Sequence, residues 1–409
     1  MRILALLSLI LIYTVSPSFA IDETIQEEIE NEASRERENE ASEDPLAQRQ
    51  TEKIDNPVLH EIMPDTFSAY ASVRIRYRDT KDDSFFGDGG SRTGINQEWQ
   101  AIPDYWLLGR LEVGFNIFDQ LNLIFDPGAQ DNSGFKETIF LRLGYVGVET
   151  PIGFLTYGKN WSTYYQVASF TDRFQGTGGG ASGTFNANTD GGPSGTGRAD
   201  RVWQTRIHVK GPFSVYKPFT VNLQYQTGQD IPALNNIKYM SSVGLSTILE
   251  RDDNLKVGIA VNYAPIHKGD LESVKERGLD GDDLAVLIGW QWFGNKWYVA
   301  TTFSWLDNHM TTNSGIYFDA WGTEGYGHYQ LAEKIWFVGG WNYLIPRSGE
   351  SQAGEYMLRY GILGVRYTFQ DFKRMIYANV RFDKSVLSSI NNEKIGNVYT
   401  VGIKWDFDW

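Results

Sequence analysis

The sequence predicts an antiparallel β-barrel of about 16 strands that crosses a membrane. Apolar and polar residues alternate along many segments of about ten residues, the length a tilted strand needs to cross a bilayer. Short turns alternate with longer polar connections, as in membrane barrels. Aromatic residues make up 14% of the chain and glycines number 42, which suits aromatic girdles at the membrane interfaces and tight turns.

The N-terminus indicates export. Arg2 precedes the apolar run from Ile3 to Val15, and small residues stand at Ser18 and Ala20. This is the pattern of a secretory signal peptide, here residues 1–20. A membrane anchor is the alternative, but the run is shorter than the roughly 20 residues that a spanning helix needs. The chain has no cysteine, so no disulfide is available to hold the exported fold together.

Residues 21–60 are predicted to form an acidic periplasmic leader. Residues 21–55 hold 13 acids and 4 bases, and such a composition cannot bury a core. We expect this leader to be disordered or partly helical, with a short coiled-coil spacer that reaches the cell wall or helps trimerisation as the alternative. The chain has no basic surface, so no nucleic-acid partner is expected.

Residues 67–409 carry the strand pattern. Odd positions from Phe67 to Tyr77 are apolar or aromatic, whereas even positions include Arg74 and Arg76. Nearly every strand has one polar face and one apolar face. This favours a barrel whose interior holds water and whose apolar outer face contacts lipid. The same alternation recurs in residues 107–117, 139–145, 219–225, 257–263, 284–292, 297–305, 361–369, 376–382 and 401–409. Residues 79–103 and 265–283 are predicted as long loops, residues 118–120 as a short turn, and the mixed phase of residues 317–334 indicates a bulge.

Residues 153–201 interrupt the alternation of apolar and polar residues. Residues 153–161 read as a strand that ends in a polar and aromatic cluster, but residues 167–200 contain no convincing strand and several glycine clusters. A connection of this length inside a compact domain is usually functional or disordered.

Here the sequence resembles the general porins of Gram-negative bacteria. Residues 153–161, Tyr164-Tyr165 and Thr171-Asp172 are similar to the fifth strand and third loop of that family. Residues 360–369 are similar to its late Gly-Leu-Arg-Tyr-x-Phe strand, and residues 401–409 to its final strand. That strand here ends on Trp409, where Phe is commoner. The resemblance covers roughly residues 67–409.

The resemblance implies a fold and a function. In the family the third loop folds into the barrel and narrows the pore, which places a constriction loop at about residues 167–201. It also implies a homotrimer in the outer membrane, surrounded by lipid and lipopolysaccharide, with Trp409 read by the barrel assembly machinery. The implied function is a water-filled channel for passive diffusion of small hydrophilic solutes and ions, without enzymatic activity or a cofactor.

The family also implies where the pore narrows. Inward bases on the early strands face acids on the loop, and the field between them filters solutes by charge and size. Strand phase assigns the basic side to Arg74, Arg76, Arg110, Arg142 and Arg206. The alternative is an ordinary wet-wall residue or a rim residue that pairs with lipopolysaccharide phosphates, most plausible for Arg78. The family's Pro-Glu-Phe-Gly-Gly stretch is not evident, so the acidic side is assigned to Asp172 first and then to Asp190 and Asp200. Trp161, Tyr164 and Tyr165 are candidate aromatics at the pore mouth.

Other chemistry has less support. The five His residues are scattered, without metal-ligand spacing, and neither a phosphate loop nor a Gly-x-Ser-x-Gly elbow is present. We therefore expect no metal site. Three alternatives stay open: a selective porin, for anions through the arginines or for sugars through the aromatics; a structural or surface-interaction barrel without a channel; and a soluble exported β-protein.

Overall fold

The computed structural model describes residues 67–81, 84–116, 139–175, 178–187, 189–209, 219–232, 234, 237–251, 254–267, 274–370, 373–387 and 396–409. The predicted signal peptide, the acidic leader and the turn at residues 118–120 lie outside the described residues. No helix in the described part of the chain is long and apolar enough to cross a membrane.

The described residues form one antiparallel sheet of 17 strands. Its strands are β1 (Phe67–Asp79), β2 (Ser84–Asp88), β3 (Arg92–Ile102), β4 (Tyr105–Phe115), β5 (Ile139–Thr150), β6 (Gly153–Trp161), β7 (Arg198–Val209), β8 (Phe219–Thr227), β9 (Ser241–Glu250), β10 (Leu255–Ala264), β11 (Asp283–Phe293), β12 (Trp297–Thr311), β13 (Tyr317–Ala332), β14 (Ile335–Pro346), β15 (Leu358–Gln370), β16 (Arg374–Asp383) and β17 (Val398–Asp408). Within the described part of the chain, three short helices lie in the connections: α6 (Tyr165–Ala168), η4 (Lys275–Arg277) and η5 (Ser351–Ala353).

The sheet closes on itself. β17 pairs with β1, and backbone hydrogen bonds join the amide of Ala69 to the carbonyl of Trp409 and the amide of Trp409 to the carbonyl of Ala69, at 3.0 and 2.8 Å. β2 and β3 pair with successive halves of β1 and together occupy one position in the wall. The fold is therefore a closed 16-stranded antiparallel barrel, as predicted, and its closure leaves no unpaired edge in the wall.

The two faces of the wall differ in polarity. On β8, Leu223 and Tyr225 are exposed, whereas Asn222, Gln224 and Gln226 are buried. Because successive side chains of a strand point to opposite faces, the apolar set lies outside and the polar set inside. Exposed aromatic side chains gather near the hairpin turns, among them Trp99, Tyr105, Trp292, Tyr329, Phe369, Phe407 and Trp409. The apolar outer face with its aromatic girdle is that of a membrane-spanning barrel.

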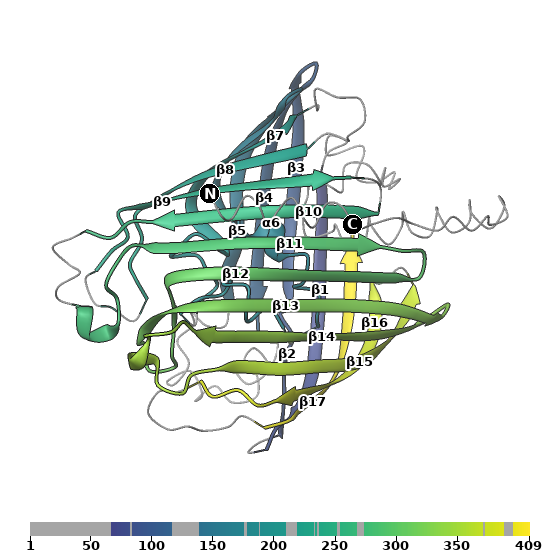
Figure 1. Cartoon of the computed structure of the whole chain (residues 1–409). Coiled ribbons are helices and arrows are strands. Elements are labelled where there is room, and N and C mark those ends of the chain that lie inside the picture. The colour runs from purple at the N-terminus through teal and green to yellow at the C-terminus, as the bar shows by residue number, and fades with distance from the viewer. Residues whose placement is uncertain are drawn as a thin grey trace, which may run out of the picture.

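The two ends of the barrel also differ. Figure 1 shows the strands side by side around the barrel, with tight hairpins at one end and long connections at the other. The tight end includes the β5–β6 hairpin, which turns at Pro151-Ile152, and the β13–β14 hairpin, which turns at Glu333-Lys334. The long connections include the β6–β7, β10–β11 and β14–β15 loops.

The prediction of a long loop at residues 79–103 is wrong, because most of this segment is strand. β2 and β3 pair with β1 and are interrupted only at residues 89–91. There the Asp88 carboxylate accepts hydrogen bonds from the amides of Gly90 and Ser91, at 2.6 and 2.8 Å. On β3, Ile95 and Trp99 are exposed on the outer face, but the surrounding polar residues hide this alternation in the sequence.

The bulge predicted within residues 317–334 is confirmed. β13 runs through this segment, and its register against β14 shifts between Gln330 and Ala332. The pairing of β12 with β13 also shifts, between Leu306 and Met310. The first shift lies at the end of β13 and the second has its extra residues in β12, so neither changes the phase of residues 317–329.

The Gly158→Ala variant should destabilise the barrel. Gly158 has a φ of +141°, and a Cβ there would lie 2.2 Å from the carbonyl oxygen of Gly144. We expect a loss of about 1–3 kcal/mol of unfolding free energy, measured by urea unfolding of the barrel in lipid vesicles. Gly109→Ala is the control, because the nearest atom to its Cβ is 4.0 Å away. Equal urea midpoints for the two variants would contradict the prediction.

Candidate functional site

The β6–β7 loop, residues 162–197, lies against the inner face of the barrel. It is bounded by Trp161 and Arg198, so the connection ends earlier than the predicted 167–201. Its helix α6 contacts β9, β10 and β11, and α6 is drawn within the outline of the barrel in Figure 1. The wall makes room for it with glycines: Cβ atoms at Gly258 and Gly289 would lie 2.8 and 3.0 Å from the Val167 side chain.

A buried carboxylate on β13 fastens the middle of this loop. Glu324 is 1% exposed. Its Oε1 accepts hydrogen bonds from the amides of Ala181 and Ser182, at 2.6 and 2.8 Å, and its Oε2 accepts one from the Thr171 hydroxyl at 2.8 Å. Charge-assisted hydrogen bonds are the strong class, so Glu324 ties two separate turns of the loop to the wall.

Further inward side chains hold the loop along the same half of the barrel. They come from β8, β10, β12 and β14, and each bonds to the loop backbone. The bonds join Gln224 Oε1 to the Thr163 amide (2.9 Å), Asn262 Nδ2 to the Ser194 carbonyl (2.8 Å), Ser304 Oγ to the Ala181 carbonyl (2.8 Å), His309 Nε2 to the Gly183 carbonyl (2.6 Å) and Asn342 Oδ1 to the Gly180 amide (2.8 Å).

The three predicted pore-mouth aromatics belong to the packing of the loop. Trp161 and Tyr165 stack with ring centroids 3.8 Å apart, and both are buried. Tyr164 is 0% exposed. Burial raises the pKa of the Tyr164 hydroxyl well above its usual range, so this hydroxyl stays protonated and donates to the carbonyl of Ser182 at 2.6 Å. The prediction that Tyr164 faces the pore mouth is wrong, because its ring has no exposed face.

One group of inward bases surrounds Glu112 on β4. Arg142 Nε lies 2.7 Å and Arg110 Nη2 3.2 Å from the carboxylate oxygens of Glu112. The Tyr70 hydroxyl donates to the same carboxylate at 2.6 Å, and Arg92 Nε lies 3.9 Å away. Arg110 and Arg142 thus share one acid that sequence analysis did not single out.

A second group of inward bases lies on β15, β16, β17 and β1. Register places Arg74 beside Lys404 and Arg76 beside Gly402, and Gly402 in turn lies beside Tyr377. Arg74, Arg76, Arg78 and Arg366 all interact electrostatically with Tyr377. We call the two groups together the arginine wall: Arg74, Arg76, Arg78, Arg92, Arg110, Arg142, Arg366, Arg381 and Lys404.

Arg206, the fifth predicted base, lies apart from the arginine wall. Its Nε donates to Asn222 Oδ1 at 2.7 Å and its Nη2 to Gln166 Oε1 at 2.8 Å. The guanidinium also lies 4.9 Å from the centroid of the Phe154 ring. Arg206 therefore joins β7 to the loop helix.

The three predicted acids have different surroundings. Asp172 accepts a hydrogen bond from the Tyr165 hydroxyl at 3.0 Å. Asp190 forms ion pairs with Lys159 and Arg198, at 3.4 and 3.3 Å. The Asp200 carboxylate accepts a hydrogen bond from the Arg201 amide at 2.9 Å, at an exposed position near the start of β7. Asp172 and Asp190 thus lie within the loop, and Asp200 follows it.

Sequence analysis missed the two acids that organise the inner face. Glu112 stands in the inward phase of β4, two residues from Arg110, so strand phase could have identified it. Glu324 lies on β13, in a segment that sequence analysis treated as mixed in phase. No sequence motif marks either residue as the partner of a distant segment.

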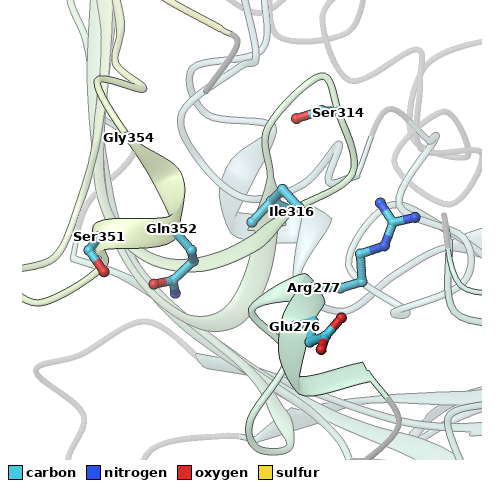
Figure 2. Close-up of a pocket in the computed structure, with 7 residues that line it drawn as sticks. All are labelled: Glu276, Arg277, Ser314, Ile316, Ser351, Gln352 and Gly354. Carbon is cyan, nitrogen blue, oxygen red and sulfur yellow. The ribbon is translucent and has the colours of Figure 1, made fainter. Parts of the chain in front are cut away.

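A separate pocket lies at the long-loop end. It has a volume of about 440 Å³ and is lined by Glu276, Arg277, Ser314, Ile316, Ser351, Gln352 and Gly354. Figure 2 shows η4 and η5 on either side of it. None of the predicted constriction residues lines this pocket. In the described part of the chain, no three His, Asp or Glu side chains gather in a way that could hold a metal ion.

Known structures share this fold. No protein-family model matches the chain, and no curated protein matches it. OmpF of Salmonella typhi, solved in complex with daunomycin, aligns with a TM-score of 0.64 at 19% identity, over 83% of this chain and 97% of that one. The anion-selective porin of Comamonas acidovorans aligns with a TM-score of 0.59 at 14% identity, over 84% and 99%. The trimer form of OmpT of Vibrio cholerae gives 0.57 at 17% identity, also over 84% and 99%. The fold is that of the 16-stranded porins.

The Glu324→Gln variant should loosen the loop. It removes the charge that strengthens the bonds to Thr171, Ala181 and Ser182, so amide hydrogen exchange in residues 178–187 should speed up roughly tenfold or more. Hydrogen-exchange mass spectrometry in detergent micelles measures this. Glu333→Gln is the matched control, because Glu333 is exposed in the β13–β14 turn. Unchanged exchange in the Glu324 variant would show that the loop is held by other bonds alone.

Proposed function

We propose that the chain is an outer-membrane channel through which small hydrophilic solutes and ions diffuse passively. The observation that carries this proposal is the division of the barrel interior. Side chains of β8, β10, β12, β13 and β14 hold the β6–β7 loop, whereas the arginine wall lies on β15 to β17, β1 and β3 to β5, where Arg366 bonds to the edge of the loop. A closed barrel whose charged inner wall is faced by a fastened loop suits a constricted aqueous passage.

The assembly of the channel is part of the same proposal. Barrels with an apolar outer band and an aromatic girdle reside in the outer membrane, and the OmpT neighbour of Vibrio cholerae was solved as a trimer. A homotrimer in contact with lipid and lipopolysaccharide follows by analogy with such barrels. Trp409 on the closing strand is the proposed assembly signal, and the acidic leader is the proposed cell-wall contact.

The arginine wall favours anions. Two acids of the inner face have basic partners: Glu112 pairs with Arg110 and Arg142, and Asp190 with Lys159 and Arg198. The bases of the wall outnumber its acids, so the local potential is positive and raises the concentration of anions. One structural neighbour is an anion-selective porin. The sugar-selective alternative loses its support, because Trp161, Tyr164 and Tyr165 are buried.

A structural barrel without a channel is the competing class, and an enzyme is a further one. Neither has a specific observation in its favour among the described residues. Liposome swelling decides between channel and closed barrel, because only an open channel admits small uncharged sugars. Absence of swelling with well-folded protein would reject the channel.

Chloride should permeate more readily than potassium. In a planar bilayer under a KCl gradient, the reversal potential should have the sign of an anion-preferring pore, because the arginine wall attracts chloride. High salt should reduce the preference by screening. A reversal potential of the opposite sign would leave the channel standing but reject anion preference.

Shortening the loop should widen the pore. Replacing residues 176–197 by a short glycine-serine linker removes the segment held by Glu324, Asn342 and Ser304, and single-channel conductance should rise. A matched control shortens the β14–β15 loop at residues 348–354, which carries none of the predicted constriction residues. Unchanged conductance with an intact barrel would place the β6–β7 loop outside the path of the solute.

A further inference from the structure

The basic side chains of β15, β16, β17 and β1 converge on one tyrosine. Backbone register sets Arg366, Tyr377, Gly402 and Arg76 in a row across the four strands. Arg76, Arg74, Arg78 and Arg366 all act electrostatically on Tyr377. Four guanidinium groups from two different regions of the sequence therefore share one small area of the inner face.

A glycine lets the tyrosine lie across the wall. A Cβ at Gly402 would stand 2.4 Å from both Cζ and Oη of Tyr377, so any larger residue there would displace the ring. Tyr377 is 4% exposed and extends over β17 toward β1. Its hydroxyl group therefore lies near the position of Arg76 on β1. The tyrosine forms the base of the arginine cluster, which we call its floor.

Two of the surrounding guanidinium groups are held in place. Arg366 Nη2 donates to the carbonyl of Arg173 in the loop at 2.8 Å. Arg381 lies over the Tyr360 ring, 3.9 Å from its centroid, and pairs with Asp383. Side chains fixed in this way lose little conformational freedom when a ligand binds.

The cluster carries an excess of positive charge. The inward acids of these four strands are Asp383, Asp406 and Asp408, and each already has a basic partner in Arg381, Lys404 and Lys373 respectively. Among the described residues, the charges that act most strongly on Arg78 are those of Arg76 and Arg381, both positive. Like charges held this close repel one another, and an anion that enters between them relieves the repulsion.

We propose that Arg76, Arg78 and Arg366, with Tyr377 as the floor, form a binding site for multiply charged oxyanions such as phosphate esters or dicarboxylates. The inference rests on the proposed channel and adds its substrate class. Guanidinium groups present paired donors that match the oxygens of a phosphate or carboxylate, whereas chloride has no such geometry. Arg74, Arg76 and Arg78 are partly exposed, so a solute in the lumen can reach the cluster.

Planar-bilayer recordings test the site with two probes, inorganic phosphate and succinate. Added phosphate should reduce the chloride current in a saturable way, because a bound dianion occupies the passage. Succinate should do the same if the site recognises any paired oxyanion, and fail if it requires a phosphoryl group. No saturable effect of either probe on a conducting channel would overturn the site. A wild-type barrel that conducts no ions would instead overturn the proposed channel.

Variants identify the residues. Arg76→Gln and Arg78→Gln should each raise the half-saturating phosphate concentration roughly tenfold, as expected for the loss of one charge-assisted pair. Arg76→Lys keeps the charge but loses the paired donors, so its value should lie between those of Arg76→Gln and the wild type. Arg359→Gln is the control, because Arg359 is exposed on the opposite face of β15. Retained heat-modifiability in gels confirms folding, and unchanged half-saturation in both folded glutamine variants overturns the assignment.

Discussion

Backbone hydrogen bonds have no partners in lipid, and this constraint governs the whole structure. An open sheet would leave the edges of β1 and β17 unsatisfied, at several kcal/mol for each buried group. The pairing of β17 with β1, completed by the bonds between Ala69 and Trp409, removes both edges. Closure then divides every strand into a lipid-facing and an enclosed set of side chains, so the polar residues come together inside.

The enclosed side chains divide into two functional halves. Opposite the arginine wall, β8 to β14 present amides, hydroxyls and glycines, which bond to the loop and leave it space. Glu324 is the main attachment point of the loop in that half, because its buried carboxylate accepts hydrogen bonds from donors in the loop. Glu112 has the matching role on the other half, where it keeps three arginines within reach of one acid. The loop and the wall thus depend on two carboxylates that face different parts of the chain.

The bases of the arginine wall outnumber the acids that face them, and this imbalance sets the electrostatic character of the interior. Asp190 is held by Lys159 and Arg198, so it cannot oppose the arginine wall as an unpartnered acid. Asp172 is the predicted acid that lies in the central part of the loop, beside Tyr165. The field across the passage is therefore weighted toward the basic side, which connects the proposed anion preference with the proposed oxyanion site around Tyr377.

The alternation of residues by itself determined the barrel, most of its strands and the inward phase of Arg74, Arg76, Arg110 and Arg142. This succeeds because phase is local: a side chain's face follows from its position in the strand. Only the tertiary structure decided that β2 and β3 are strands of the wall, that Tyr164 is buried and that Glu324 fastens the loop. These facts depend on contacts between segments far apart in the chain, across a closed interior, and no local period records which enclosed side chains will meet there.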